Sequence, residues 1–140
     1  MIFNKLIPEL TVSNLEKSLH FYVKTIGFKI EYQREEENFA FVSLQGSQVM
    51  LDERNGNWET GRLERPFGRG INLQIEVDQL NPILKSIEAS SYILMKPPWE
   101  SWYRKDSESV GQREFLIQDP DGYLLRFAEH IGFRSALKDS

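Results

Sequence analysis

The order of hydrophobic patterns in this 140-residue chain occurs twice, and that repeat is the strongest constraint on its fold. In the first half, apolar and polar side chains alternate over residues 5–12, which predicts a half-buried strand with Leu6, Leu10 and Val12 on one face. Apolar residues at helical spacing follow, capped by Ser13 or Asn14 and ended by Gly27. Three further short strands are predicted at 28–32, 39–44 and 49–53.

The second half repeats the order of strand, helix and three strands. Ile71, Leu73, Ile75 and Val77 alternate with Asn72, Gln74 and Glu76, the clearest strand pattern in the chain. A helix is predicted next, beginning at Asp78 or at Asn81 with Pro82 in its first turn. The last three strands are predicted at about 91–95, 112–118 and 123–129. Residues 55–69 lack periodicity and are rich in Gly and Arg, so they are predicted to link the two halves.

The last two predicted strands form a hairpin around Asp119-Pro120-Asp121-Gly122. This segment supplies a local hydrogen-bond acceptor, a preset φ and a residue that tolerates positive φ. Side chains alternate along the strand after the turn, so Arg126 lies on the face opposite Leu125 and Phe127. Across both halves we expect the core to contain Leu10, Val12, Leu19, Leu73, Ile75, Leu84, Leu125 and Phe127.

Composition narrows the class of protein. The chain is 40% hydrophobic and 27% charged, as expected for a single globular domain. It has no cysteine, which excludes a disulfide framework, a thiolate nucleophile and a Cys-ligated zinc site. The formal charge of −4 argues against nucleic acid and anionic membranes as partners. No apolar run is long enough for a spanning helix and the N-terminus lacks a signal peptide pattern, so a cytoplasmic location is predicted.

Two segments, Leu10 to Phe28 and Asp119 to Glu129, together resemble the vicinal oxygen chelate superfamily. This superfamily includes glyoxalase I, extradiol dioxygenases, fosfomycin-resistance enzymes and the non-catalytic bleomycin-resistance proteins, which the chain resembles most in type. The resemblance implies an α+β fold in which two βαβββ modules form a concave eight-stranded mixed sheet with helices outside. We expect a single domain over 1–135, with module 1 at about 4–54, module 2 at about 70–130 and a C-terminal tail at 131–140. A homodimer is also expected, because a second copy can close the open hollow of such a sheet.

The same resemblance assigns four metal-ligand positions, usually His and Glu in the enzymes. These positions fall on Ile7, Leu51, Asn72 and Arg126. Arginine is permanently cationic and the other three are poor ligands for a hard or borderline cation. We therefore predict no metal and no cofactor of the kind the enzymes hold.

A displaced metal site is the alternative to that prediction. Glu9, Glu53 and Glu76 lie two or four residues from the family positions, so strand alternation predicts that they share the concave face. They also have a purely structural interpretation, because Arg126 can pair with Glu9 or Glu76 across the sheet.

Aromatic and amide side chains complete the predicted binding site. Tyr32 and Phe39 match positions that form aromatic walls in bleomycin-resistance proteins, whereas a tryptophan found in those proteins corresponds here to Gly111. Trp99 and Trp102 lie in a predicted loop and can either replace that tryptophan or cover the edge of the core. The predicted ligand-binding residues are Glu9, Tyr32, Phe39, Glu53, Asn72, Gln74, Glu76, Trp99, Trp102 and Arg126.

These residues favour a non-catalytic small-molecule binder that sequesters a cationic or aromatic, antibiotic-like ligand, such as a bleomycin-like glycopeptide. Three carboxylates against one guanidinium give the groove a negative potential, and planar groups can stack on its aromatic walls. Two alternatives remain at this point. One is a metal-dependent glyoxalase- or dioxygenase-like enzyme that uses the displaced carboxylates. The other is an accessory or regulatory domain with a vestigial pocket.

Overall fold

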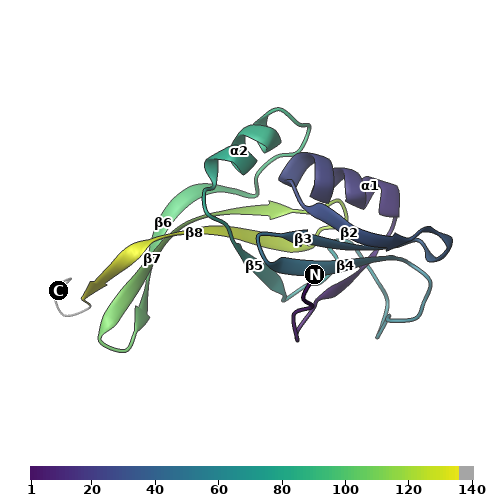
Figure 1. Ribbon diagram of the computed structural model, residues 1–140, viewed down its shortest axis with the longest axis horizontal. Coiled ribbons are helices and arrows are strands. Elements are labelled where there is room, and N and C mark those ends of the chain that lie inside the picture. Colours follow the sequence, from purple (N-terminus) through teal and green to yellow (C-terminus); the bar gives the residue numbers. More distant parts are fainter. Residues whose placement is uncertain (136–140) are drawn as a thin grey trace. The chain divides into compact units, whose positions relative to one another are not determined.

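The computed structural model describes residues 1–135, which form two compact units. The first unit contains residues 1–71 together with 118–123, and the second contains 72–117 and the residues from Leu124 on. Each unit has one four-stranded mixed sheet with a helix on one face (Figure 1). The predicted α+β class and the two βαβββ modules are confirmed. The eight strands form two separate four-stranded sheets, whereas the resemblance implied one continuous sheet.

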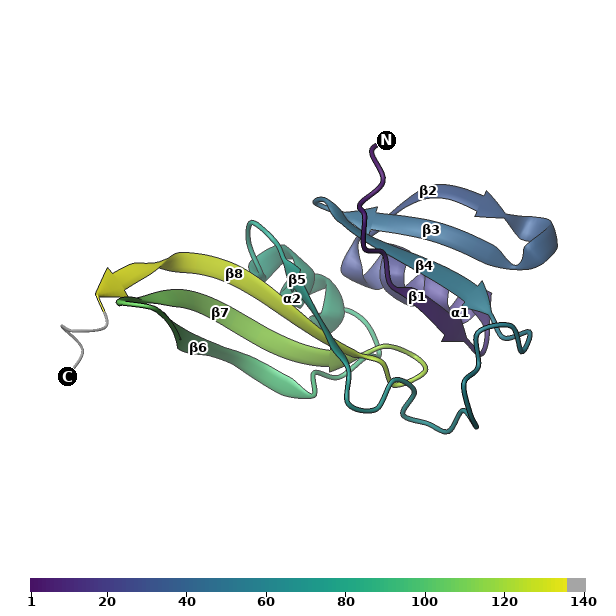
Figure 2. The ribbon, with the colours of Figure 1, turned by 90° about the horizontal axis from the view of Figure 1, so that it is seen from below.

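The first unit follows the predicted order closely. Its sheet has the strand order β1-β4-β3-β2, with β1 parallel to β4 and the other neighbours antiparallel (Figure 2). A π-helical turn continues the first helix, and a short 3-10 helix follows β2. The elements are β1 Glu9–Val12, α1 Leu15–Leu19, η1 His20–Ile26, β2 Lys29–Arg34, η2 Glu35–Glu37, β3 Phe39–Leu44 and β4 Ser47–Glu53.

The first helix begins and ends at the predicted residues. Asn14 is its N-cap, because its side-chain oxygen accepts a hydrogen bond from the Lys17 amide at 2.9 Å. Glu53 at the end of β4 accepts the Leu15 amide at 3.0 Å and satisfies a second free donor of the first turn. Gly27 ends the π-helical segment with a φ of 110°, a left-handed conformation that glycine adopts without strain.

The second unit repeats the architecture with longer strands. Its sheet has the order β5-β8-β7-β6, with β5 parallel to β8 and β6 antiparallel to β7. The helix begins at Asn81, the second of the two predicted starts, with Pro82 in its first turn. The elements are β5 Asn72–Glu76, α2 Asn81–Glu88, β6 Lys96–Lys105, β7 Glu108–Gln118 and β8 Leu124–Ser135.

Three strand predictions were wrong in position. Residues 91–95 are irregular and β6 begins at Lys96, so the tryptophan segment predicted as a loop is a strand. Proline is tolerated there because β6 is an edge strand, and a register shift occurs between Lys96 and Trp99, where Pro97 and Pro98 lie. The first strand is also shorter than predicted, which leaves Leu6 86% exposed. Residues 131–135 extend β8 instead of forming a tail, and 136–140 lie outside the described residues.

The predicted core is largely confirmed. Five of its eight members are buried, namely Leu10, Val12, Ile75, Leu125 and Phe127. Leu19, Leu73 and Leu84 are half-buried. Asn72 and Gln74 are exposed while Ile75 is buried, which confirms the predicted register of β5.

The turn between β7 and β8 packs within the first unit through a buried aspartate. One oxygen of Asp119 accepts the amides of Asp121 and Tyr123, each at 2.9 Å, and the other accepts the Tyr22 hydroxyl at 2.8 Å. Asp121 in turn accepts the amide of Ser13 at 3.0 Å. Burial raises the pKa of Asp119 to about 6 despite these donors, and it raises the pKa of Tyr22 well above its usual range.

Because the folded-state pKa of Asp119 is higher than its unfolded value, its contribution to stability is present at low pH and is lost as pH rises through about 6. The substitution Asp119→Asn keeps the shape of the side chain and removes the carboxyl group that titrates. We expect the free energy of unfolding of the wild type, relative to this variant, to fall by up to about 3 kcal/mol between pH 4 and pH 7. Urea denaturation across this range measures the difference. Asp106→Asn, at an exposed turn, is the matched control and should keep the wild-type slope; equal slopes for Asp119→Asn would contradict the assignment.

Candidate ligand-binding pocket

The sheet face of the first unit that points away from its buried core carries two rows of side chains. Residues paired directly across neighbouring strands point to the same face. One row runs Arg34, Phe39, Asp52 and Thr11 across β2, β3, β4 and β1. The second row, two residues along, runs Tyr32, Phe41, Met50 and Glu9. The apolar residues at the alternate positions, such as Leu10 and Leu51, are buried on the other face.

Six of these eight side chains, all except Thr11 and Phe41, line the floor of an open pocket of about 480 Å³. Aromatic rings from β2 and β3 lie toward one side and carboxylates from β1 and β4 toward the other. The lining residues are Glu9, Tyr32, Arg34, Glu37, Phe39, Met50, Asp52, Asn55, Asn57 and Trp58. The structure therefore brings together three predicted site residues, Glu9, Tyr32 and Phe39.

The pocket lining carries more negative than positive charge. Arg34 forms an ion pair with Glu37 at 2.7 Å, whereas the ion pairs found among residues 1–135 include neither Glu9 nor Asp52. Desolvation raises the pKa of Glu9 and the nearby charge of Asp52 adds to this, while Arg34 and a hydrogen bond from Trp58 oppose them. Asp52 is 7% exposed, and its hydrogen bond from the Asn55 side chain is long, at 3.4 Å. Two carboxylates thus face the pocket with weak compensation.

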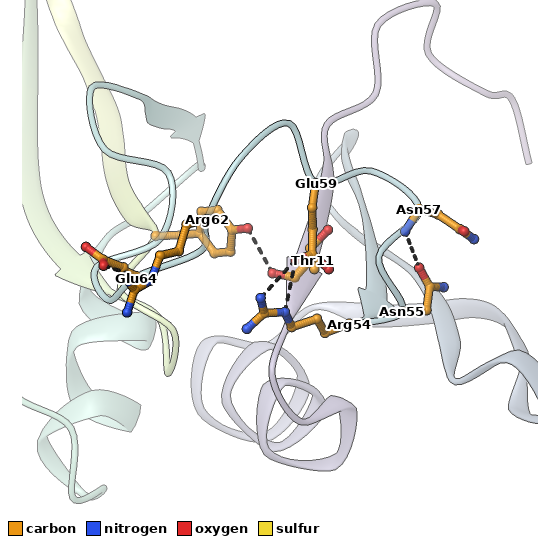
Figure 3. Close-up of polar contacts among 8 residues, drawn as sticks. Thr11, Arg54, Asn55, Asn57, Glu59, Arg62 and Glu64 are labelled. Atoms are coloured by element: carbon orange, nitrogen blue, oxygen red, sulfur yellow. Dashed lines mark hydrogen bonds and ion pairs between the residues drawn. The ribbon is translucent and has the colours of Figure 1, made fainter.

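The segment after β4 places Trp58 at the pocket, and this residue was not among the predicted site residues. Arg54 reaches Glu59 with hydrogen bonds of 2.9 and 3.1 Å, and the Asn57 amide donates to the Asn55 side chain at 2.8 Å (Figure 3). These contacts lie on either side of Trp58, a residue that is 65% exposed. The segment lacks periodicity, so no sequence pattern indicates where this tryptophan lies.

The N-terminal segment places a further unpredicted aromatic residue, Phe3, against rings of this sheet face but outside the pocket lining. Gln48 accepts the Asn4 amide at 2.7 Å and donates to the Ile2 carbonyl at 2.7 Å. Phe3 consequently packs edge-on against Phe41, with ring centroids 5.5 Å apart, and lies 6.5 Å from Tyr32.

Glu53 and Leu51 were assigned to the wrong face. Both follow Leu10 and Val12 to the helix side of the sheet, because each is paired in register with one of these residues. Glu53 caps α1 there, and Leu51 is fully buried. Met50, not Leu51, is the β4 residue paired with Glu9. Glu53 therefore cannot contribute to the displaced metal site considered from the sequence.

The second unit gathers a different polar cluster. Arg126 donates to the side chain of its cross-strand partner Gln74, and its Nε lies 3.4 Å from an oxygen of Glu114. Glu114 is fully buried and accepts hydrogen bonds from the Tyr103 hydroxyl at 2.5 Å and from Gln112 at 2.9 Å. Arg126 therefore does pair with a carboxylate, but Glu114 replaces the two partners proposed from the sequence.

The remaining predicted residues of the second unit do not all share a face. Asn72 and Glu76 are exposed on β5, on the face that carries Gln74. Trp99 is the cross-strand partner of Glu114 and lies under the Lys96 ammonium at 4.0 Å.

Trp102 pairs with Gly111 and points to the opposite face from Trp99. A Cβ atom at position 111 would lie 2.5 Å from the Trp102 ring. Trp102 thus fills the space of a side chain at 111, while Arg134 lies over its ring at 3.9 Å.

Comparison with known proteins agrees with this architecture. Residues 6–127 match the model of the Glyoxalase/Bleomycin resistance protein/Dioxygenase superfamily. The chain belongs to this superfamily. A lactoylglutathione lyase of Neisseria meningitidis is 27% identical over 125 residues, covering 86% of each chain. A bleomycin resistance protein of Staphylococcus aureus is 24% identical over 138 residues, covering 89% of this chain and 96% of that protein. The crystal structure of TioX from Micromonospora sp. ML1 shares the fold, with a TM-score of 0.70 at 15% identity over 92% of this chain and 100% of its own.

The side chains present do not fit the metal that enzymes of this superfamily hold. Within residues 1–135, no group of three or more His, Asp and Glu side chains lies close enough together to bind one. Of the four family positions, Leu51 faces the helix and Arg126 is engaged with Glu114 and Gln74.

None of the helices within residues 1–135 is long and apolar enough to cross a membrane.

Arg126→Met should leave the buried charge of Glu114 without its cationic partner and lower the free energy of unfolding by about 3 kcal/mol. The double variant Glu114→Gln/Arg126→Met removes both charges and keeps an acceptor for Tyr103, so most of the loss should be recovered. Guanidinium denaturation of the wild type, both single variants and the double variant gives the coupling energy. Additive losses would show that the two side chains do not stabilise each other.

Proposed function

We propose that this superfamily member is a non-catalytic binding protein that holds a planar, cationic aromatic ligand in the pocket of its first unit. The observation that carries the proposal is the position of two weakly compensated carboxylates, Glu9 and Asp52, beside the aromatic side chains of Tyr32, Phe39 and Trp58. A ligand with a delocalised positive charge matches both halves of this pocket.

The energetics favour a cation over a neutral ligand. Bringing a positive charge near Glu9 offsets both its desolvation and its repulsion by Asp52. Aromatic faces attract cations, and the attraction grows as the site loses water. The volume of about 480 Å³ lies within the usual range for drug-sized ligands.

We further propose that the ligand is antibiotic-like, with a bleomycin-type glycopeptide as the first candidate, and that binding sequesters it and so confers resistance. The similarity to bleomycin resistance proteins supports this identity. The homodimer, the cytoplasmic location and the role of the second-unit residues Asn72, Gln74, Glu76, Trp99, Trp102 and Arg126 in ligand binding also stay predictions.

Isothermal titration calorimetry with bleomycin and with ethidium, a planar aromatic cation, tests this binding. Glu9→Gln should weaken binding about tenfold, because it removes a charged acceptor from the pocket. Glu36→Gln, which removes an equal charge from an exposed position outside the pocket lining, is the matched control and should bind like the wild type. Equal losses in both variants would indicate only a general charge effect. Affinity of the wild type should also fall as pH is lowered through the raised pKa of Glu9.

The similarity to lactoylglutathione lyases supports an enzyme as the alternative. We expect freshly purified protein to contain no stoichiometric metal by elemental analysis. We also expect no lactoylglutathione lyase activity after addition of zinc or nickel. Turnover that depends on added metal and is lost in Glu9→Gln would contradict the proposal and favour the enzyme.

A further inference from the structure

Phe39 is only 3% exposed although it lies on the pocket face of its sheet. Part of its cover is a charged side chain, because the Arg34 guanidinium lies 3.9 Å from the centre of the ring. Tyr32 contributes at a greater distance, with ring centroids 6.1 Å apart. The pocket therefore already holds a planar cation on its most buried aromatic ring.

Arg34 is held in this place by an ion pair with Glu37, by the ring of Phe39 and by a hydrogen bond with Tyr32. Its partner Glu37, three residues along the chain, has a side chain that is 58% exposed, and the Arg34 side chain is itself 43% exposed. Surface ion pairs of this kind contribute little to stability. The ion pair with Glu37 therefore does little to retain Arg34, and a ligand that replaces its contacts with Phe39 and Tyr32 can displace the side chain into solvent.

A ligand cation on the same ring can make an interaction that Arg34 does not make. Asp52 is the neighbour of Phe39 on β4, whereas Arg34 is its neighbour on β2. The backbones that carry Arg34 and Asp52 are two strand spacings apart, about 10 Å. A cation that enters from the pocket can lie over Phe39 and against Asp52 together, so the exchange favours the ligand.

We propose that Arg34 is an internal surrogate ligand, which covers Phe39 until the guanidinium or amidinium group of a ligand replaces it. This inference rests on the proposed function and specifies the chemical class of the group that enters. A planar, weakly hydrated cation lies flat on an aromatic ring and presents its N–H groups to a carboxylate at the edge, which a compact and strongly hydrated ammonium does less well. Arg34 then competes with the ligand and lowers its apparent affinity.

Calorimetric titration with benzamidine tests this mechanism, with benzylamine as the ammonium comparison. Arg34→Ala should bind benzamidine about tenfold more tightly than the wild type, because the competing cation is gone. Arg62→Ala is the matched control, since Arg62 also forms an exposed ion pair, with Glu64 at 3.1 Å, and lies outside the pocket. It should bind like the wild type. In all three proteins, benzamidine should bind more tightly than benzylamine.

A second measurement uses the wild type alone. The side-chain NMR resonances of Arg34, shifted by the Phe39 ring current, should move toward unperturbed values when benzamidine saturates the protein. Benzamidine binding that is unchanged or weaker in Arg34→Ala, with the Arg34 resonances unmoved, would overturn the surrogate role and leave the proposed function standing. Failure of both proteins to bind benzamidine, bleomycin or ethidium would overturn both.

Discussion

The parallel pairing of β1 with β4 is the constraint on which the pocket depends. It aligns Glu9 with Met50 and Thr11 with Asp52, so two carboxylates reach the same face of the sheet as the aromatic residues of β2 and β3. The same register sends Leu10, Val12 and Leu51 to the core. A shift of one residue would bury the carboxylates and expose the leucines, so the stability of the core maintains the chemistry of the pocket.

The acidic side chains differ in how many hydrogen-bond and ion-pair partners their carboxylates have. This difference separates structural from functional carboxylates. Asp119 receives three hydrogen bonds, and Glu114 receives two hydrogen bonds and the charge of Arg126. Such complete sets of partners are what buried charge requires. Within residues 1–135, the hydrogen-bond donors found for Glu9 and Asp52 are the side chains of Trp58 and Asn55. The remaining acceptor capacity at the pocket is what a cationic ligand would use.

Local sequence patterns predicted the fold well because most helices, strands and turns are marked by their own residues. Alternation marked β5, the cap at Asn14 and the left-handed Gly27 delimited the first helix, and the turn around Asp119 marked the last hairpin. The errors arose where tertiary context decides. An edge strand accommodates Pro97 and Pro98 through a register shift, which no propensity indicates.

The site was predicted only in part for a similar reason. Glu9, Tyr32 and Phe39 were identified from strand alternation and family resemblance, but a one-residue error in the face of β4 exchanged Asp52 for Glu53. Trp58 and Glu114 could not be found from sequence. Trp58 depends on hydrogen bonds of an aperiodic segment, and the role of Glu114 depends on contacts between strands far apart in the chain.

We propose that a planar cation binds in the acidic and aromatic pocket of the first unit. The most direct test is an NMR titration of the Glu9 side-chain carboxyl carbon, with and without saturating ethidium. A cation bound in the pocket stabilises the ionised carboxylate, so the raised pKa of Glu9 should fall when the ligand is bound. An unchanged Glu9 pKa in protein shown to be saturated with ethidium would place the ligand outside this pocket and contradict the proposed site.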